Sequence, residues 1–144
     1  MDRNTQLAIA RAFERYPRGM RYRKATEDDL RSFEAQFGAI PKILRWFLVE
    51  CGGGVVGSEW VDGIDELVET HNRFSEERAE GFWDLLDQVF VIGRDGGGNY
   101  FGIQRATGSI VVQDHDFGGI HTMAQSFDAF LAAGFSDLPE LQNV

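Results

Sequence analysis

The sequence has one cysteine and no long apolar run, and each scarcity excludes a class of protein. With Cys51 alone, no disulfide can form within the chain, which suits a reducing compartment. Cys51 lies on an apolar helical pattern, which indicates a small buried hydrophobe and not a reactive thiol. The first residues carry charges every few positions, too many for a signal peptide or a membrane span. We therefore expect a cytoplasmic protein.

Positive charge is scarce outside the first residues. The 144 residues include 14 Lys and Arg against 23 Asp and Glu, a formal net charge of −9. Residues 1–24 hold seven of the basic residues and two of the acidic ones, so they carry +5 and the rest of the chain carries −14. This acidic body argues against a nucleic-acid-binding face and favours either plain solubility or electrostatic steering toward a basic partner. We interpret the basic segment as a solvated helix face of the same domain.

Apolar residues recur at helical spacing in five segments. The predicted helices cover Thr5–Tyr16, the segment from Thr26 to Gly38, the segment from Ile40 to Cys51, a segment that begins at Ile64, and one that begins after Ser126. Thr26 is the predicted N-cap of the second helix, with Asp29 three residues on. The charged segment 69–80 either extends or frays the fourth helix. The next apolar residues, predicted to return the chain to the core, are Phe82, Trp83, Leu85 and Leu86.

The stretch from Val89 to Asp116 predicts a three-stranded antiparallel meander, with reversals at Gly96–Gly98 and at a Thr-Gly turn. Val55–Val61 predicts a short strand or hairpin, and the residues from Asp116 to Gly119 a loop. The fold class is α+β: a small, mainly antiparallel sheet flanked by about five helices, on one side of it, in a single domain. Residues 1–24 are predicted to form its basic leader, residues 25–134 its body, and residues 135–144 a loosely held tail.

The sequence contains no complete catalytic, metal or cofactor motif. No helix follows the glycine run, as a phosphate site would require, and the EF-hand carboxylate is missing. The histidines and Cys51 lack zinc-ligand spacing, and no nucleophile elbow is present. An acid/base or metal site built from Asp114, His115 and Asp116 is the alternative, against solvated turn residues and caps. We therefore expect a protein without enzymatic activity or cofactor.

Polar residues at the ends of the meander and a tryptophan in the hairpin are the candidates for a binding surface. Asp95 and Asn99 flank the glycines, and Asp114 and Asp116 close the last strand, so the meander places them either at one rim or at two. Trp60 stands between Glu59 and Asp62. A half-exposed tryptophan among carboxylates is typical of an anchor in a protein interface, although it can also cover the edge of a core.

The order of several segments resembles the SUKH superfamily, which contains the Smi/Knr type of domain. The residues that carry the resemblance are the Phe37–Pro41 segment, the aromatic helix to Cys51-Gly52-Gly53, Trp60, the Val91–Phe101 segment, the Gly108–His115 strand and the Ser126–Leu131 helix. The resemblance implies an α+β fold and protein binding: many bacterial members are immunity proteins that neutralise a toxin, often a nuclease, and fungal members regulate cell-wall synthesis. Cys51 and Asn99 depart from the asparagine and aspartate often found there.

The resulting hypothesis is an immunity-type module whose acidic face docks a basic toxin. The expected face consists of Glu59, Trp60, Asp62, Asp95, Asn99, Asp114 and Asp116. Because a nuclease must hold phosphates, its surface is basic and an acidic partner finds it quickly. We expect no nucleic-acid or membrane partner. The alternative is an intracellular regulatory or scaffold protein of the same fold without a toxin partner.

Overall fold

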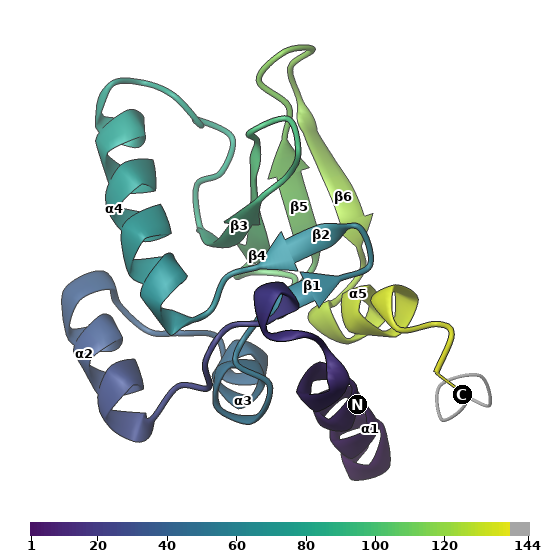
Figure 1. The fold of residues 1–144 in the computed structure, drawn as a ribbon. Coiled ribbons are helices and arrows are strands. Elements are labelled where there is room, and N and C mark those ends of the chain that lie inside the picture. Colours follow the sequence, from purple (N-terminus) through teal and green to yellow (C-terminus); the bar gives the residue numbers. More distant parts are fainter. Residues whose placement is uncertain (139–144) are drawn as a thin grey trace.

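The computed structural model describes residues 1–138, which form five α-helices and two antiparallel sheets (Figure 1). In chain order the elements are α1 (Arg3–Arg15), the 3₁₀ turn η1 (Arg18–Met20), α2 (Glu27–Phe37), α3 (Lys42–Glu50), β1 (Gly54–Val56), β2 (Glu59–Val61), α4 (Ile64–Ala79), β3 (Val89–Arg94), β4 (Tyr100–Gln104), β5 (Ile110–Gln113), β6 (Ile120–Ala124) and α5 (Phe127–Gly134). The α+β prediction is confirmed. No helix in this range is long and apolar enough to cross a bilayer.

Two helices begin at the capping residues that the sequence predicted, α2 after Thr26 and α5 after Ser126. The first helix begins at Arg3, two residues before the predicted Thr5, because Asp2 caps it. Thr26 and Asp29 form a complete capping box on α2: the Thr26 hydroxyl accepts from the Asp29 main-chain nitrogen, and the Asp29 carboxylate accepts from that of Thr26. The charged segment after residue 69 extends α4 to 16 residues. The predicted tail begins with Phe135, which is buried in the core, and its residues 139–144 lie outside the described residues.

The larger sheet has four strands, in the order β3-β4-β5-β6, so the three-stranded prediction was wrong by one strand. The predicted loop from Asp116 to Gly119 is present and turns at Gly118 and Gly119. The strand that was not predicted is β6, which then returns along β5. The second sheet is the predicted hairpin of β1 and β2, which turns at Gly57-Ser58. In Figure 1 this hairpin lies between the four-stranded sheet and the helices α1, α3 and α5.

The main core fills one face of the four-stranded sheet. Alternate strand residues point into it, among them Phe90, Ile92, Phe101 and Ile103. Aromatic rings join the surrounding helices: Phe47 of α3 makes edge contacts, with centroid separations of 5.3 Å, both to Phe13 of α1 and to Phe127 of α5.

A second, smaller core covers the opposite face, so the helices do not all lie on one side as predicted. It consists of Phe74, Trp83, Leu86, Val89, Val91, Tyr100 and Val111, of which Phe74 comes from α4. The predicted return of residues 82–86 to the core is correct for Trp83 and Leu86. It is wrong for Phe82 and Leu85, which expose 60% and 44% of their surfaces.

Candidate protein-binding surface

The strand order brings the predicted polar residues of the meander to one rim of the sheet. Arg94 pairs with Tyr100, Phe101 with Val112, and Gln113 with Ile120. The end of β3, the start of β4, the end of β5 and the start of β6 are therefore neighbours. We call this edge the acidic rim and define it as Asp95, Asn99, Asp114, His115, Asp116 and Phe117.

Asp95 shapes the glycine turn at the rim. Its Oδ1 accepts from the main-chain nitrogens of Gly97 and Asn99, each at 2.9 Å, and its Oδ2 accepts from the Asn99 side-chain amide at 3.2 Å. The carboxylate thereby accepts hydrogen bonds from main-chain N–H groups that the tight glycine turn would otherwise leave without a partner. Asp95 is a structural residue of the rim as well as a source of negative charge.

Asn99 connects this turn to the end of β5. It is buried, and its Oδ1 accepts from the main-chain nitrogen of His115 at 3.0 Å and contacts the imidazole Nδ1. The His115 ring also makes a T-shaped contact with Trp83 of the second core, at a centroid separation of 5.8 Å. The two turns at the rim are thus held in a fixed relation to each other.

The β5–β6 loop presents an uncovered aromatic side chain among carboxylates. Asp114 Oδ1 accepts from the main-chain nitrogens of Asp116 and Phe117 at 2.9 and 3.0 Å, and these bonds lower the pKa of Asp114. The turn leaves Phe117 92% exposed. The Asp116 carboxylate lies 3.3 Å from His115 Nε2, and no main-chain group of residues 1–138 donates a hydrogen bond to it. In Figure 1 this loop is the part of the sheet farthest from the N-terminal helices.

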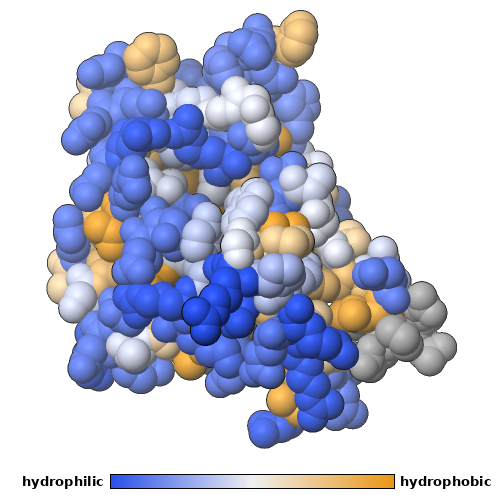
Figure 2. All heavy atoms as spheres, in the orientation of Figure 1, coloured by the Kyte–Doolittle hydropathy of each residue, from blue (hydrophilic) through white to orange (hydrophobic). Residues whose placement is uncertain are grey.

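Further apolar side chains, which sequence reasoning did not assign to a surface, lie near the rim. Leu85 donates its main-chain nitrogen to the Gln113 side chain, whose amide in turn donates to Asp84, so the segment after α4 is tied to the end of β5. The exposed apolar residues of this region are Phe82, Leu85, Phe117 and Ile120. In Figure 2 single hydrophobic groups stand among hydrophilic ones at this end of the molecule. An unexplained Phe after a run of three polar residues was the only sequence signal for Phe117.

The hairpin places its two candidate residues in different surroundings. Glu59 lies near Asp95, and burial followed by the Asp95 charge raises the pKa of Glu59. Side chains alternate along a strand, so the next residue faces the other way. Trp60, 40% exposed, packs against Tyr22, with a centroid separation of 5.7 Å. Glu59 therefore adjoins the acidic rim, whereas Trp60 does not.

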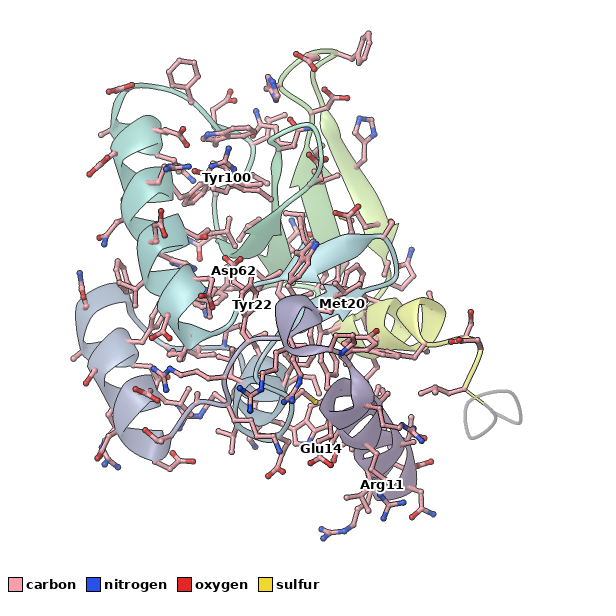
Figure 3. The ribbon with its side chains drawn as sticks, viewed as in Figure 1. Arg11, Glu14, Met20, Tyr22, Asp62 and Tyr100 are labelled. Carbon is pink, nitrogen blue, oxygen red and sulfur yellow. The ribbon has the colours of Figure 1, made fainter. Side chains whose placement is uncertain are left out.

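Asp62 points inward, away from both surfaces. Its main-chain nitrogen donates to Ile92 at the β-bulge of β3, and its carboxylate accepts from the Thr70 hydroxyl at 2.6 Å. It lines a hollow of about 210 Å³ between α4 and Arg94, and burial raises the pKa of Asp62 to about 7. Figure 3 shows Asp62 and Tyr100 beside α4. Of the seven predicted residues, the structure groups four at the rim with Glu59 beside them, and separates Trp60 and Asp62.

The chemistry of these residues suits binding. Within residues 1–138 no cluster of three His, Cys, Asp or Glu side chains is arranged to hold a metal ion. The carboxylates of Asp95 and Asp114 are occupied by main-chain donors, and Cys51 is buried, which raises the pKa of its thiol to about 12. What the rim presents outward is negative charge around an aromatic side chain.

Comparison with known proteins identifies the family of the chain through a family profile and not through an individual relative. No curated protein sequence matches the chain. The profile of the SMI1 / KNR4 family (SUKH-1) matches residues 24–133, which run from the end of the basic segment almost to the end of α5. This match covers well over half of the chain, and it agrees with the resemblance and with the α+β fold. The protein therefore belongs to the SMI1 / KNR4 family (SUKH-1).

Proposed function

We propose that the protein is an immunity-type binding module that neutralises a cognate basic toxin, with the acidic rim and Glu59 as its docking face. Membership of the SUKH-1 family supports a protein partner in general. Trp60 and Asp62, predicted for the same face, are left out because one packs beside Tyr22 and the other bonds to Thr70.

The observation that carries the proposal is the exposure of Phe117 on a loop that its neighbours hold in shape. A large apolar side chain that is 92% exposed costs free energy in water, and a partner that covers it recovers that cost. Because hydrogen bonds to Asp114 already order the turn, little conformational entropy is lost when Phe117 docks. Aromatic anchors surrounded by polar residues are the usual centres of protein interfaces.

The charge of the chain indicates what kind of partner fits. Residues 25–144 carry −14, and the rim adds carboxylates at the contact itself. Opposite charge accelerates encounter with a basic surface and makes binding sensitive to salt. A nuclease toxin is basic because it must hold phosphates, so it satisfies both conditions.

The test is capture followed by neutralisation. The tagged chain is used at low salt as bait in its native cells, and the eluted proteins are identified as salt rises. The rim variant Asp116→Asn with Phe117→Ser removes charge and anchor but no main-chain hydrogen bond. The matched control, Asp28→Asn with Leu7→Ser, changes an exposed carboxylate and an exposed apolar residue of α2 and α1.

We expect the wild type and the control to capture one basic protein and to protect cells that express it, and the rim variant to do neither. A captured protein that is harmless when expressed would instead favour the regulatory alternative. Protection that persists in the rim variant would exclude the rim as the docking face.

A further inference from the structure

The basic segment between α1 and α2, residues 17–25, crosses the surface as a strap in which extended backbone follows η1. It packs on Gly52, Gly53 and Gly54. Tyr22 donates its main-chain nitrogen to Gly53, and Arg21 forms an isolated bridge with Gly54. A Cβ atom on Gly54 would lie 2.4 Å from the Met20 carbonyl oxygen. The strap therefore depends on the absence of side chains beneath it, and its outer side chains have a defined position.

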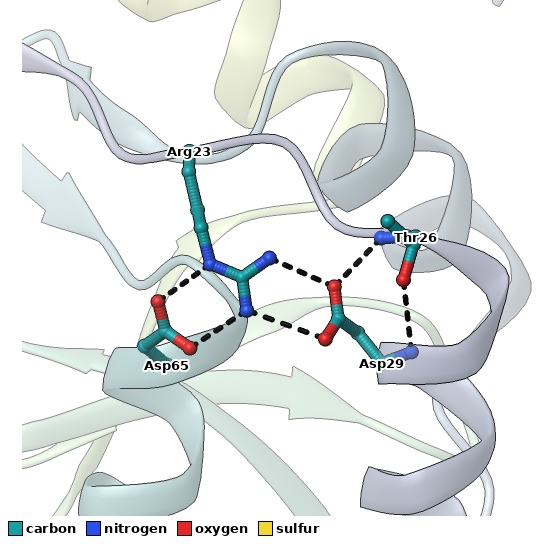
Figure 4. A network of polar contacts seen from close by, with 4 residues as sticks. All are labelled: Arg23, Thr26, Asp29 and Asp65. Atoms are coloured by element: carbon teal, nitrogen blue, oxygen red, sulfur yellow. Dashed lines mark hydrogen bonds and ion pairs between the residues drawn. The ribbon is translucent and has the colours of Figure 1, made fainter.

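One arginine of the strap is used to hold it in place. The Arg23 guanidinium donates to Asp29 at the start of α2 and to Asp65 at the start of α4, with distances from 2.7 to 3.3 Å (Figure 4). These carboxylates raise the pKa of Arg23, while Arg23 lowers those of Asp29 and Asp65. Arg23 therefore fixes the strap to the starts of α2 and α4, and the carboxylates of Asp29 and Asp65 already balance its charge.

Two other arginines of the strap are not balanced in this way. Within residues 1–138, no carboxylate lies within 4.0 Å of the guanidinium of Arg18 or Arg21. Arg21 donates its Nε to the Tyr16 carbonyl at 3.2 Å, and its two terminal nitrogens donate to no group within the described residues. Because Arg18 and Arg21 are three residues apart on the strap, they place two positive charges without a paired carboxylate near each other.

Aromatic side chains complete this surface. Arg18, Arg21, Tyr22 and Arg23 line a hollow of about 370 Å³, and the Tyr22 ring lies against the half-exposed Trp60. Figure 3 shows Tyr22 and Met20 on the two sides of η1. Donor forks beside aromatic faces form a surface that holds a carboxylate and the apolar residue next to it.

We propose that this strap patch, defined as Arg18, Arg21, Tyr22 and Trp60, is a second interaction surface that binds an acidic, aromatic-containing segment of a protein. Both the charge and the place of the patch separate it from the acidic rim. The family match begins at residue 24, so the strap up to Arg23 lies outside the matched residues. A protein segment fits better than nucleic acid, because two free guanidinium groups form no track along a phosphate backbone and the acidic body repels one.

A defined probe tests this without knowledge of the partner. A fluorescein-labelled peptide of alternating Glu and Tyr is titrated at low salt against the full chain, and fluorescence anisotropy gives Kd. The variant Arg18→Glu with Arg21→Glu reverses two charges in the patch. Arg3→Glu with Arg11→Glu reverses two charges of exposed residues on α1 and is the matched control. Thermal unfolding confirms that each variant is folded.

We expect the patch variant to weaken binding by about tenfold or more, and the control to weaken it by about twofold or less. Trp60→Ser should weaken binding, Trp60→Phe should restore most of it, and the rim variant Asp116→Asn with Phe117→Ser should bind as tightly as the wild type. Equal losses in patch and control variants would overturn the proposal, since attraction would then be nonspecific. Tighter binding of an oligothymidylate than of the peptide would overturn it in favour of nucleic acid.

Discussion

Asn99 Oδ1 accepts a hydrogen bond from the main-chain nitrogen of His115 at 3.0 Å and also contacts the imidazole Nδ1. The same asparagine donates its amide to Asp95, so one buried side chain joins the turn between β3 and β4 to the loop that carries Phe117. The order of the acidic rim therefore depends on a side chain that is itself largely buried. Substitution of Asn99 should therefore affect mainly the stability of the rim, and substitution of Asp116 and Phe117 mainly its binding.

Asn99→Ala should lower the free energy of unfolding by about 1–3 kcal/mol, because it leaves the His115 N–H without its acceptor and removes the amide donor of Asp95 Oδ2. Urea unfolding of the purified chain measures this change. Asp116→Ala is the control: its carboxylate is exposed and bonds to no main-chain group, so its effect should be within about 0.5 kcal/mol. Equal losses in both variants would mean that Asn99 does not organise the rim.

Asp62→Asn should stabilise the protein above neutral pH. The folded chain keeps a proton on Asp62 up to about pH 7, whereas the unfolded chain releases it near the ordinary value of 3.8, so Asp62 costs stability progressively as pH rises between these values. The Thr70 hydroxyl can still donate to the amide oxygen. We expect a gain of about 1–4 kcal/mol at about pH 8, shrinking to nothing near pH 4.

The pH dependence of stability that His71 causes gives a second test of the Asp62 prediction. Burial among Phe33, Phe37 and Phe90 lowers the pKa of His71 to about 4, so the unfolded chain takes up a proton below about pH 6.5 that the folded chain refuses. His71 therefore costs stability as pH falls, opposite to Asp62. In Asp62→Asn, the loss of stability that His71 causes as pH falls should therefore become visible in denaturant titrations from pH 8 to 4. If the free energy of unfolding of Asp62→Asn changed with pH in parallel with that of the wild type, this result would contradict the inward position of Asp62.

Gly54→Ala should detach the strap from the hairpin. Gly54 has a φ of 136°, and its added Cβ would meet Met20 O at 2.4 Å, so both backbone strain and a clash oppose the side chain. We expect a loss of about 2–4 kcal/mol and faster trypsin cleavage after Arg18 and Arg21. Gly19→Ala, with nothing within 4 Å of its Cβ, should change neither stability nor cleavage. Resistance of Gly54→Ala to trypsin would show that the glycine contact does not hold the strap.

The helices could be predicted because each has a stripe of apolar residues, and α2 and α5 also begin at a capping residue that the sequence shows, Thr26 and Ser126. β6 could not, because its first three residues are exposed and its pairing with β5 is made by main-chain groups, which leave no mark in the side-chain pattern. The prediction that Phe82 and Leu85 face the core was wrong for a related reason. Trp83 and Gln88 adopt positive φ, so the segment between them follows neither helical nor strand alternation.

The rim could be predicted in part. The residues that form turns, Asp95 and Asp114, were identified because short polar side chains satisfy main-chain donors beside glycines. The antiparallel strand order that gathers them at one edge depends on long-range pairing, which the sequence left open between one rim and two. The inward position of Asp62 follows from the bulge at Ile92, which frees a carbonyl for the Asp62 nitrogen and has no local signal.

The most direct test of the acidic rim is the affinity for the captured toxin, measured as salt is raised, for the wild type, the rim variant and the matched control. For the wild type and for Asp28→Asn with Leu7→Ser, we expect tight binding that weakens steeply with salt. Asp116→Asn with Phe117→Ser should bind about tenfold or more weakly and with a shallower salt dependence. An unchanged Kd and salt dependence in the rim variant would contradict the proposal that this protein binds its partner through the acidic rim.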